Sequence, residues 1–255
     1  PQPEPACTEQ FGSGTYYCTV THDDIAREFY YYLPQNYSEN SSSMPLLISL
    51  HGGDDYADSN MSYTNFRDLA DENDFVPIFP QGTVAEEKGA TGWFTGACDS
   101  SSVCDLGFID SIIDFMGENI NIDLDRVYAT GFSNGAFMAY SLGCNLSAKI
   151  AGVAAVAGTM EIGSISTCQS IHPMPILHIH GTNDQLVPYN QSVIFNKKLL
   201  QAGCDSVLIT VKEGGHGGFK NEKIKILTNK FFDKHLRNSN FEIKEQTIKQ
   251  FNSSD

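Results

Sequence analysis

The sequence predicts an α/β fold in which a mostly parallel central sheet carries helices on both faces. Strand-like and helix-like patterns alternate from about residue 45 to residue 236, with no internal repeat or linker between them. Of the 255 residues, 41% are hydrophobic, which is enough for one sizeable core. We therefore expect one main domain over residues 25–236, preceded by an N-terminal extension over residues 1–24 and followed by a polar tail over residues 237–255.

The individual elements follow from local patterns. Short apolar or β-branched runs that stop at glycine or proline predict strands at 27–34, 45–53, 75–82, 125–131, 150–158, 174–181 and 206–214. Apolar residues at helical spacing predict helices at 62–74, 105–120, 133–145, 190–203 and 221–236. A long polar loop over 83–104 separates two of these elements, and the tail after Arg237 is expected to be a frayed helix end or a connector.

The charge balance narrows the class of partner. The formal net charge is −15 and no basic run occurs, which argues against nucleic acid and against anionic membrane surfaces. The longest uncharged apolar run, residues 150–160, is too short to cross a bilayer, which takes about 20 residues. We therefore expect a neutral or small-molecule partner and no membrane span.

Seven cysteines are many for a reduced cytosolic enzyme that shows no metal-binding spacing. None of them forms a C-x-x-C pair. His178 and His180 share one face of a predicted strand, but no carboxylate or cysteine stands at zinc-ligand spacing, so we expect buried, hydrogen-bonded histidines. The sequence predicts no metal and no cofactor, and it favours an oxidising, extracellular setting.

A serine between two glycines marks the junction of predicted strand 125–131 and predicted helix 133–145. Gly131, Ser133 and Gly135 satisfy G-x-S-x-G, the pattern of a nucleophile on a sharp strand-to-helix turn. Glycine is needed there because side chains would collide with the neighbouring strand and helix. The N-terminus of the helix, beginning with the Asn134 amide, is a candidate oxyanion site. A purely structural turn serine is the alternative.

A serine hydroxyl needs a base, and the base needs a carboxylate that orients it. Asp184 follows predicted strand 174–181, and His216 lies in a glycine-rich loop after predicted strand 206–214. Both loops leave the carboxyl ends of strands, where open α/β sheets keep their sites, and the chain order of serine, acid and histidine fits. Asp184 as a helix cap, Glu161 as the acid, and His216 as an ordinary loop residue remain alternatives.

Two loops earlier in the chain contain further candidate site residues. Gly53, in "SLHGGDD", is the best candidate for a second oxyanion donor, since glycine lets the backbone approach a substrate closely. Trp93, the single tryptophan, lies in the long polar loop. It is either an aromatic platform that faces the substrate or a hydrophobic plug for its own loop.

Several motifs occur together in one order: "HGG", "DLGFID", "GFSNGAFMAY", "VAAVAGTM", "HIHGTNDQLVPY" and "GGHGGF". Over about residues 25–236 they resemble the secreted esterases related to polyhydroxybutyrate depolymerases and to feruloyl and acetylxylan esterases. The resemblance implies an α/β-hydrolase catalytic domain over this region. It implies Ser133 as nucleophile, Asp184 as acid and His216 as base.

The chain departs from the family at one place. The family often has an aromatic residue, commonly Trp, two positions after the histidine. Gly218 holds that position here and Phe219 stands beside it, so Phe219 is the candidate for substrate contact. The resemblance implies one disulfide and neighbouring cysteines suggest two local ones: Cys144–Cys168, then Cys98–Cys104 and Cys7–Cys18. Cys204 is left over.

The resemblance implies ester hydrolysis in two steps through an acyl-enzyme. Feruloyl or acetyl esters of plant cell-wall xylan are the expected substrates, and polyhydroxybutyrate or another polyester is the alternative. A serine peptidase and an inactive hydrolase fold that only binds a ligand are less favoured. We expect a secreted protein, monomeric in the simplest case, that acts on a small-molecule, polysaccharide or polyester ester.

Overall fold

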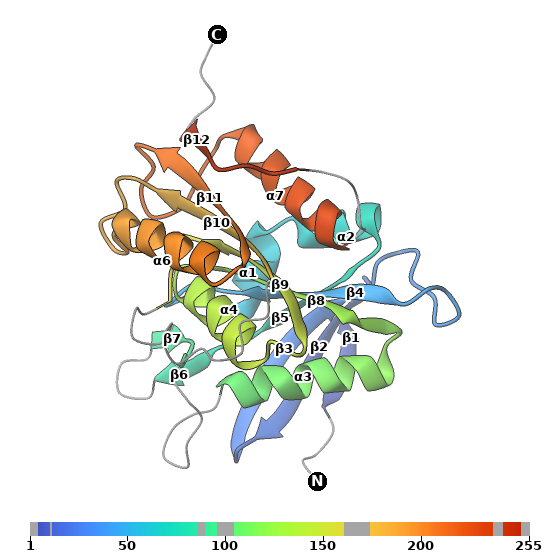
Figure 1. The fold of residues 1–255 in the computed structure, drawn as a ribbon. Helices are drawn as coiled ribbons and strands as arrows, with labels where there is room; N and C mark the ends of the chain where they lie inside the picture. The colour runs from blue at the N-terminus through green and yellow to red at the C-terminus, as the bar shows by residue number, and fades with distance from the viewer. Residues whose placement is uncertain are drawn as a thin grey trace. The chain divides into compact units, whose positions relative to one another are not determined.

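The structure is a computed structural model that describes residues 5–10, 12–85, 90–95, 105–160, 174–236 and 242–250. It divides the chain into two compact units, residues 1–129 and residues 130–255, whose elements are labelled in Figure 1. One strand, β8 (Ile122–Phe132), continues from the first unit into the second. Each unit is described by itself below.

The first unit contains strands and helices of the predicted kinds. Its strands are β1 (Ala6–Gln10), β2 (Thr15–His22), β3 (Ile25–Tyr32), β4 (Met44–Leu50), β5 (Val76–Pro80), β6 (Thr83–Ala85) and β7 (Ala90–Gly92). Its helices are α1 (Ala57–Tyr63), α2 (Phe66–Asn73) and α3 (Asp105–Asn119). The strand order is β1-β2-β3-β5-β4, with β4 and β5 parallel and the other neighbours antiparallel.

Three parts of this unit differ from the prediction. Residues 1–24 were expected to be an extension, but β1 and β2 pair with each other and β2 pairs with β3. The helix predicted over 62–74 is two helices, because Thr64 adopts an extended backbone with ψ 137°. The loop over 83–104 contains the antiparallel pair β6 and β7.

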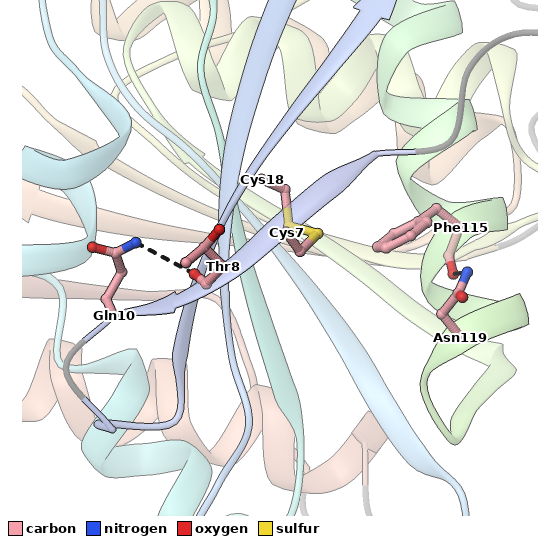
Figure 2. Close-up of a disulfide and its surroundings, with 6 residues drawn as sticks. All are labelled: Cys7, Thr8, Gln10, Cys18, Phe115 and Asn119. Carbon is pink, nitrogen blue, oxygen red and sulfur yellow. Dashed lines mark hydrogen bonds between the residues drawn. A yellow bond between two sulfur atoms is a disulfide. The ribbon is translucent and has the colours of Figure 1, made fainter.

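The disulfide between Cys7 and Cys18 is confirmed. The two cysteines are direct partners in the β1–β2 register, so the bridge links the two strands of this hairpin. Figure 2 shows the Phe115 ring of α3 pointing toward the bridge. Cys204 is free and buried.

The other predicted disulfides are described only in part. Cys144 is disulfide-bonded. Its predicted partner Cys168 lies outside the described residues, and so does the predicted pair Cys98–Cys104.

The second unit is a parallel α/β arrangement. Its elements are α4 (Asn134–Asn145), β9 (Ile150–Val156), β10 (Pro175–Gly181), α6 (Tyr189–Gln201), β11 (Asp205–Lys212), α7 (Glu222–Leu236) and β12 (Gln246–Lys249). Neighbours in the order β9-β10-β11-β12 all pair in parallel. Their carboxyl ends therefore lie at the same edge, where such sheets place their sites.

Helices cover both faces of these strands, as the sequence predicts. Tyr140 of α4 and Phe195 of α6 both contact the His178 ring, so α4 and α6 pack on the same face of β10. Figure 1 shows α6 and α7 on opposite sides of β10 and β11. The tail predicted after Arg237 includes β12, an edge strand that the sequence did not predict. Within the described ranges, no helix is long and apolar enough to cross a membrane.

Candidate active site

Ser133 occupies a sharp turn between β8 and α4. Its φ of 52° and ψ of −116° are a conformation that a residue with a Cβ rarely adopts. The Ser133 N–H donates to the Val156 carbonyl at 2.9 Å. A Cβ on Gly131 would lie 2.3 Å from the Gly135 carbonyl oxygen, so the backbone can turn this tightly only with glycine at Gly131. The predicted strand–serine–helix turn is therefore present.

Helix α4 begins at Asn134, directly after the serine. The Ser133 carbonyl accepts the amides of Ala136 and Phe137 at 2.9 and 3.2 Å, which closes the first turn. The start of a helix concentrates backbone N–H groups and positive partial charge. The Ser133 hydroxyl thus stands at the positive end of α4, where a negative oxygen would be stabilised.

His216 lies within hydrogen-bond reach of both predicted partners. Its Nε2 is 2.7 Å from Ser133 Oγ, and its Nδ1 is 2.7 Å from Asp184 Oδ2. The loops after β10 and β11 come very close together, since a Cβ on Gly181 would lie 2.3 Å from the Gly214 carbonyl oxygen. Close packing of these two strand ends brings the acid and the histidine, 32 residues apart, into contact.

The Asp184 carboxylate is fully buried, with 0% of its side chain exposed. Burial by itself would raise the pKa of Asp184. The hydrogen bonds from His216 and from the Val187 and Leu186 amides, both at 2.9 Å to Oδ1, outweigh burial and lower this pKa. Because Asp184 is ionised, it accepts a proton-bearing Nδ1 from His216, which leaves Nε2 free to accept the Ser133 hydroxyl proton.

One residue beside the histidine was missed by sequence reasoning. The Phe132 ring lies 5.1 Å from the His216 ring, centroid to centroid, and is partly exposed. Gly217, with φ +85°, makes room for it, because a Cβ there would lie 2.4 Å from the Phe132 ring. Phe132 is the second residue of the G-x-S-x-G pattern, and only the fold shows that it turns toward the base. An aromatic wall therefore stands at His216, although Gly218 holds its expected position.

The remaining predicted site residues lie as follows. Phe219 is half-buried in the loop after His216. Gly53 lies in the turn after β4 in the first unit and is exposed. Trp93, also in the first unit, is 5% exposed and donates its indole N–H to the His51 carbonyl at 2.9 Å, which ties down its own loop. Glu161, the alternative acid, lies outside the described residues.

The arrangement has no recognisable place for a metal within the described part of the chain, where no group of three or more histidine, cysteine or acidic side chains could hold one. His178 and His180 are both buried on β10, as the sequence predicts. His178 bonds to the Tyr140 hydroxyl at 2.6 Å, and His180 lies 3.1 Å from Asp184 Oδ2.

Known proteins share this architecture. A family model described as phospholipase/carboxylesterase matches residues 106–236, about half of the chain. A ferulic acid esterase from Anaeromyces mucronatus superposes with a TM-score of 0.61 at 20% identity, covering 83% of this chain and 88% of that one. An acetyl xylan esterase from Aspergillus awamori gives a TM-score of 0.67 at 13% identity, covering 84% and 99%. At these sequence identities, the two structural similarities show the fold alone.

Proteins that are similar in sequence are also named as esterases. A bifunctional acetylxylan esterase/xylanase of Neocallimastix patriciarum is 36% identical over 165 residues, which are 65% of this chain and 22% of that protein. A probable feruloyl esterase C of Aspergillus clavatus is 30% identical over 203 residues, covering 74% of this chain and 66% of that protein. The chain thus spans less than two thirds of the length of either. The predicted fold and the predicted resemblance are confirmed: the chain belongs to the phospholipase/carboxylesterase family and has the α/β-hydrolase fold.

Proposed function

We propose that the protein is a serine carboxylic-ester hydrolase that removes feruloyl or acetyl groups from plant cell-wall xylan through an acyl-enzyme. The observation that carries the proposal is the unbroken chain of two 2.7 Å hydrogen bonds from Ser133 through His216 to the buried Asp184. Nucleophile, base and orienting acid stand in this relation in serine hydrolases of unrelated folds.

The first half of the reaction forms the acyl-enzyme. His216 Nε2 takes the hydroxyl proton of Ser133 as Oγ attacks the ester carbonyl carbon. Asp184 stabilises the imidazolium that results and keeps the ring in its tautomer. The protonated Nε2 then gives its proton to the alkoxy oxygen as the carbon–oxygen bond breaks, so the sugar hydroxyl leaves and the acyl group stays on Ser133.

The second half repeats these steps with water. His216 removes a proton from the attacking water, and Ser133 leaves with that proton while the carboxylic acid is released. The Asn134 amide at the start of α4 is the proposed oxyanion donor in both halves. Gly53, in the first unit, stays a prediction from the sequence as the second donor.

The proposed substrates rest on the named relatives. The Neocallimastix and Aspergillus relatives are named as acetylxylan and feruloyl esterases. The partly exposed Phe132 ring beside His216 offers an apolar contact to an acyl group at the reacting centre. Phe219 and Trp93 remain predicted substrate contacts. We further propose that the protein works outside the cell, which the Cys7–Cys18 disulfide supports because such bonds persist in oxidising compartments.

The decisive test of the activity is Ser133→Ala with p-nitrophenyl acetate as substrate. Removal of a serine nucleophile costs on the order of 10⁶ in kcat in a well-studied serine hydrolase, and we expect a loss of this order here. Ser141→Ala is the matched control, because Ser141 is a buried serine of the same helix, eight residues further along. Full turnover by a folded Ser133→Ala protein would overturn the proposal.

The substrate class needs a separate measurement. We expect kcat/KM on methyl ferulate or acetylated xylan to exceed that on hydroxybutyrate oligomers. The reverse order would replace the xylan-ester proposal with the polyester alternative. A folded protein that neither hydrolyses any of these esters nor reacts with a fluorophosphonate at Ser133 would instead be a binding module.

A further inference from the structure

The triad acid has a second imidazole partner that the proposed reaction does not use. His180, at the end of β10, places Nε2 3.1 Å from Asp184 Oδ2. The same oxygen accepts His216 Nδ1 at 2.7 Å. His180 has 1% of its side chain exposed and Asp184 has none, so the two groups meet out of contact with water. Two imidazoles therefore converge on one carboxylate oxygen.

The surroundings of His180 determine where its proton lies. Nε2 is also 2.9 Å from the Val187 carbonyl oxygen. A carbonyl and an ionised carboxylate can only accept, so Nε2 must carry a hydrogen, which it donates to the Val187 carbonyl while it lies 3.1 Å from Asp184 Oδ2. On the other side of the ring, Nδ1 is 2.7 Å from the Ser192 hydroxyl of α6, which can donate to it. His180 thus has a neutral ring with a fixed tautomer, and burial, which lowers its pKa, favours the same form.

These contacts enclose the acid loop from two sides. The Val187 amide donates to Asp184 Oδ1, while the Val187 carbonyl accepts from His180. The carboxylate accepts two backbone amides at Oδ1 and His216 Nδ1 at Oδ2, and the His180 ring lies against Oδ2 at 3.1 Å. Each oxygen has its donors in place, and rotation of the carboxylate about its own axis would break bonds at both.

We propose that His180 is a positioning residue that fixes the Asp184 carboxylate so that it accepts His216 Nδ1 in the orientation needed for base catalysis. The inference rests on the proposed function, since it assigns His180 a part in that reaction. His180 touches neither Ser133 nor the acyl group in this scheme. Its effect reaches the reaction only through Asp184.

The neighbouring histidine provides a matched control. His178 lies two residues earlier on the same strand and face, is equally buried, and bonds to the Tyr140 hydroxyl instead of the triad. A change at His178 therefore reports what the loss of a buried imidazole from β10 does to folding alone. A change at His180 has this effect on folding and, in addition, any effect on catalysis that results from a displaced Asp184 carboxylate.

The experiment compares His180→Met, His180→Gln and His178→Met by kcat and KM on p-nitrophenyl acetate. We expect His180→Met to lower kcat about 10- to 100-fold, the range found when groups that orient an active residue are removed, with KM changed less than about twofold. His180→Gln should recover most of this loss, because a glutamine amide can place a donor where Nε2 stands. His178→Met should leave kcat of the folded protein unchanged.

A double-mutant cycle separates positioning from a general structural effect. In an Asp184→Ala background, His180→Met should change the rate of Ser133 labelling by a fluorophosphonate less than about twofold, because its target is gone. An equal loss in both backgrounds, or failure of glutamine to rescue, would overturn the inference. If His180→Met does not fold, Ser192→Ala removes only the hydroxyl that orients the ring, and a kcat equal to wild type would then count against the proposal. If the fluorophosphonate labels Ser133 but no ester is hydrolysed, the proposed ester activity is rejected. The double-mutant cycle, which is read by labelling, still decides the role of His180 in that case.

Discussion

Each of the two units has a completely buried carboxylate among its described residues, and the two carboxylates have opposite kinds of partner. Asp105 in the first unit lies 2.6 Å from the guanidinium of Arg27, and their side chains are 0% and 3% exposed. Asp184 in the second unit lies against the imidazoles of His216 and His180. One carboxylate faces a permanent cation, and the other faces rings that can be neutral.

The Asp105 pair is fully engaged within the first unit. Asp105 also accepts the Thr83 hydroxyl at 3.1 Å and the Phe94 amide at 2.7 Å. Arg27 donates to the Gln81 carbonyl at 3.1 Å as well. The pair therefore ties β3, the chain after β5 and the start of α3 together. Because a guanidinium does not give up its proton in proteins, the pair can hold a structure but cannot move a proton.

In the reaction proposed above, the partner of the buried carboxylate decides whether a proton can move. His216 retains 16% exposure on its side chain and keeps Nε2 directed at Ser133, so a proton can reach it and leave. An arginine in that place would satisfy Asp184 equally well but could not act as a base. We expect the loss of the Asp184 charge to change the rate and the loss of the Asp105 charge to change the stability.

Of the changes at the two carboxylates, Asp184→Asn should have the larger effect. The amide can favour the other His216 tautomer, with the proton on Nε2, which then cannot accept from Ser133. The equivalent change in a serine protease lowers kcat by about 10⁴ with the geometry intact, and we expect the same order here. The measurement is kcat/KM for p-nitrophenyl acetate, with circular dichroism to confirm folding. A loss below tenfold would assign the acid role to another residue.

Asp105→Asn should act on stability instead. It leaves the buried Arg27 guanidinium, which lies 3.9 Å over the Phe108 ring, without its charge partner. Breaking a buried ion pair in this way costs about 3–5 kcal/mol. Urea denaturation measures the cost, and kcat per folded molecule should stay at the wild-type value.

A double variant tests the reason for that cost. Arg27→Met with Asp105→Leu removes both charges, and replacing a whole buried pair by apolar groups is often neutral. We expect the double variant to be more stable than Asp105→Asn. If it were less stable, the polar contacts of Asp105 would matter more than the unpaired charge.

The sequence was sufficient to predict that Ser133, His216 and Asp184 lie together, because chemistry and topology constrain their positions strongly. Ser133, Asp184 and His216 each follow a strand, namely β8, β10 and β11. The parallel pairs β9–β10 and β10–β11 bring the ends of β9, β10 and β11 to one edge, and the Ser133 amide bonds to the Val156 carbonyl at the end of β9. The edge strands β1 and β12, and β2 between β1 and β3, were missed. Strand preference at an edge depends on the neighbour that it pairs with more than on its own residues, and β12 is only four residues long.

Contacts between side chains that are far apart in the sequence could not be predicted from the sequence. Arg27 and Asp105 are 78 residues apart, and neither sits in a recognisable motif. The motif "HIHGTND" predicts buried histidines but does not indicate that His180 turns toward Asp184 while His178 turns toward Tyr140. Likewise, Phe132 belongs to the serine pattern as an unspecified residue. Such partners follow from strand register and helix packing, which only the fold supplies.

The smallest predicted effect, over the range from pH 7 to pH 5, concerns His178, a buried histidine of the second unit. Burial lowers the pKa of His178 to about 3, so the ring is neutral in the folded protein, whereas it titrates near 6.5 in the unfolded chain. Because the folded pKa is the lower one, the unfolded chain binds one more proton between these values. The free energy of unfolding should therefore fall as the pH is lowered from about 6.5 toward 3, by at most about 1.4 kcal/mol per pH unit from this residue.

His178→Asn isolates this contribution, because its amide oxygen can still accept the Tyr140 hydroxyl but does not titrate. We expect urea denaturation between pH 7 and pH 5 to show a shallower loss of stability in this variant than in the wild type. Tyr140→Phe is the control: it deletes the hydrogen bond but keeps the imidazole, so it should lower stability at every pH and leave the slope unchanged. Equal slopes for wild type and His178→Asn would mean that His178 does not stay neutral in the fold. The comparison between the Arg27–Asp105 ion pair and neutral buried histidines would then be supported only by His180 and His216, the two histidines that contact Asp184.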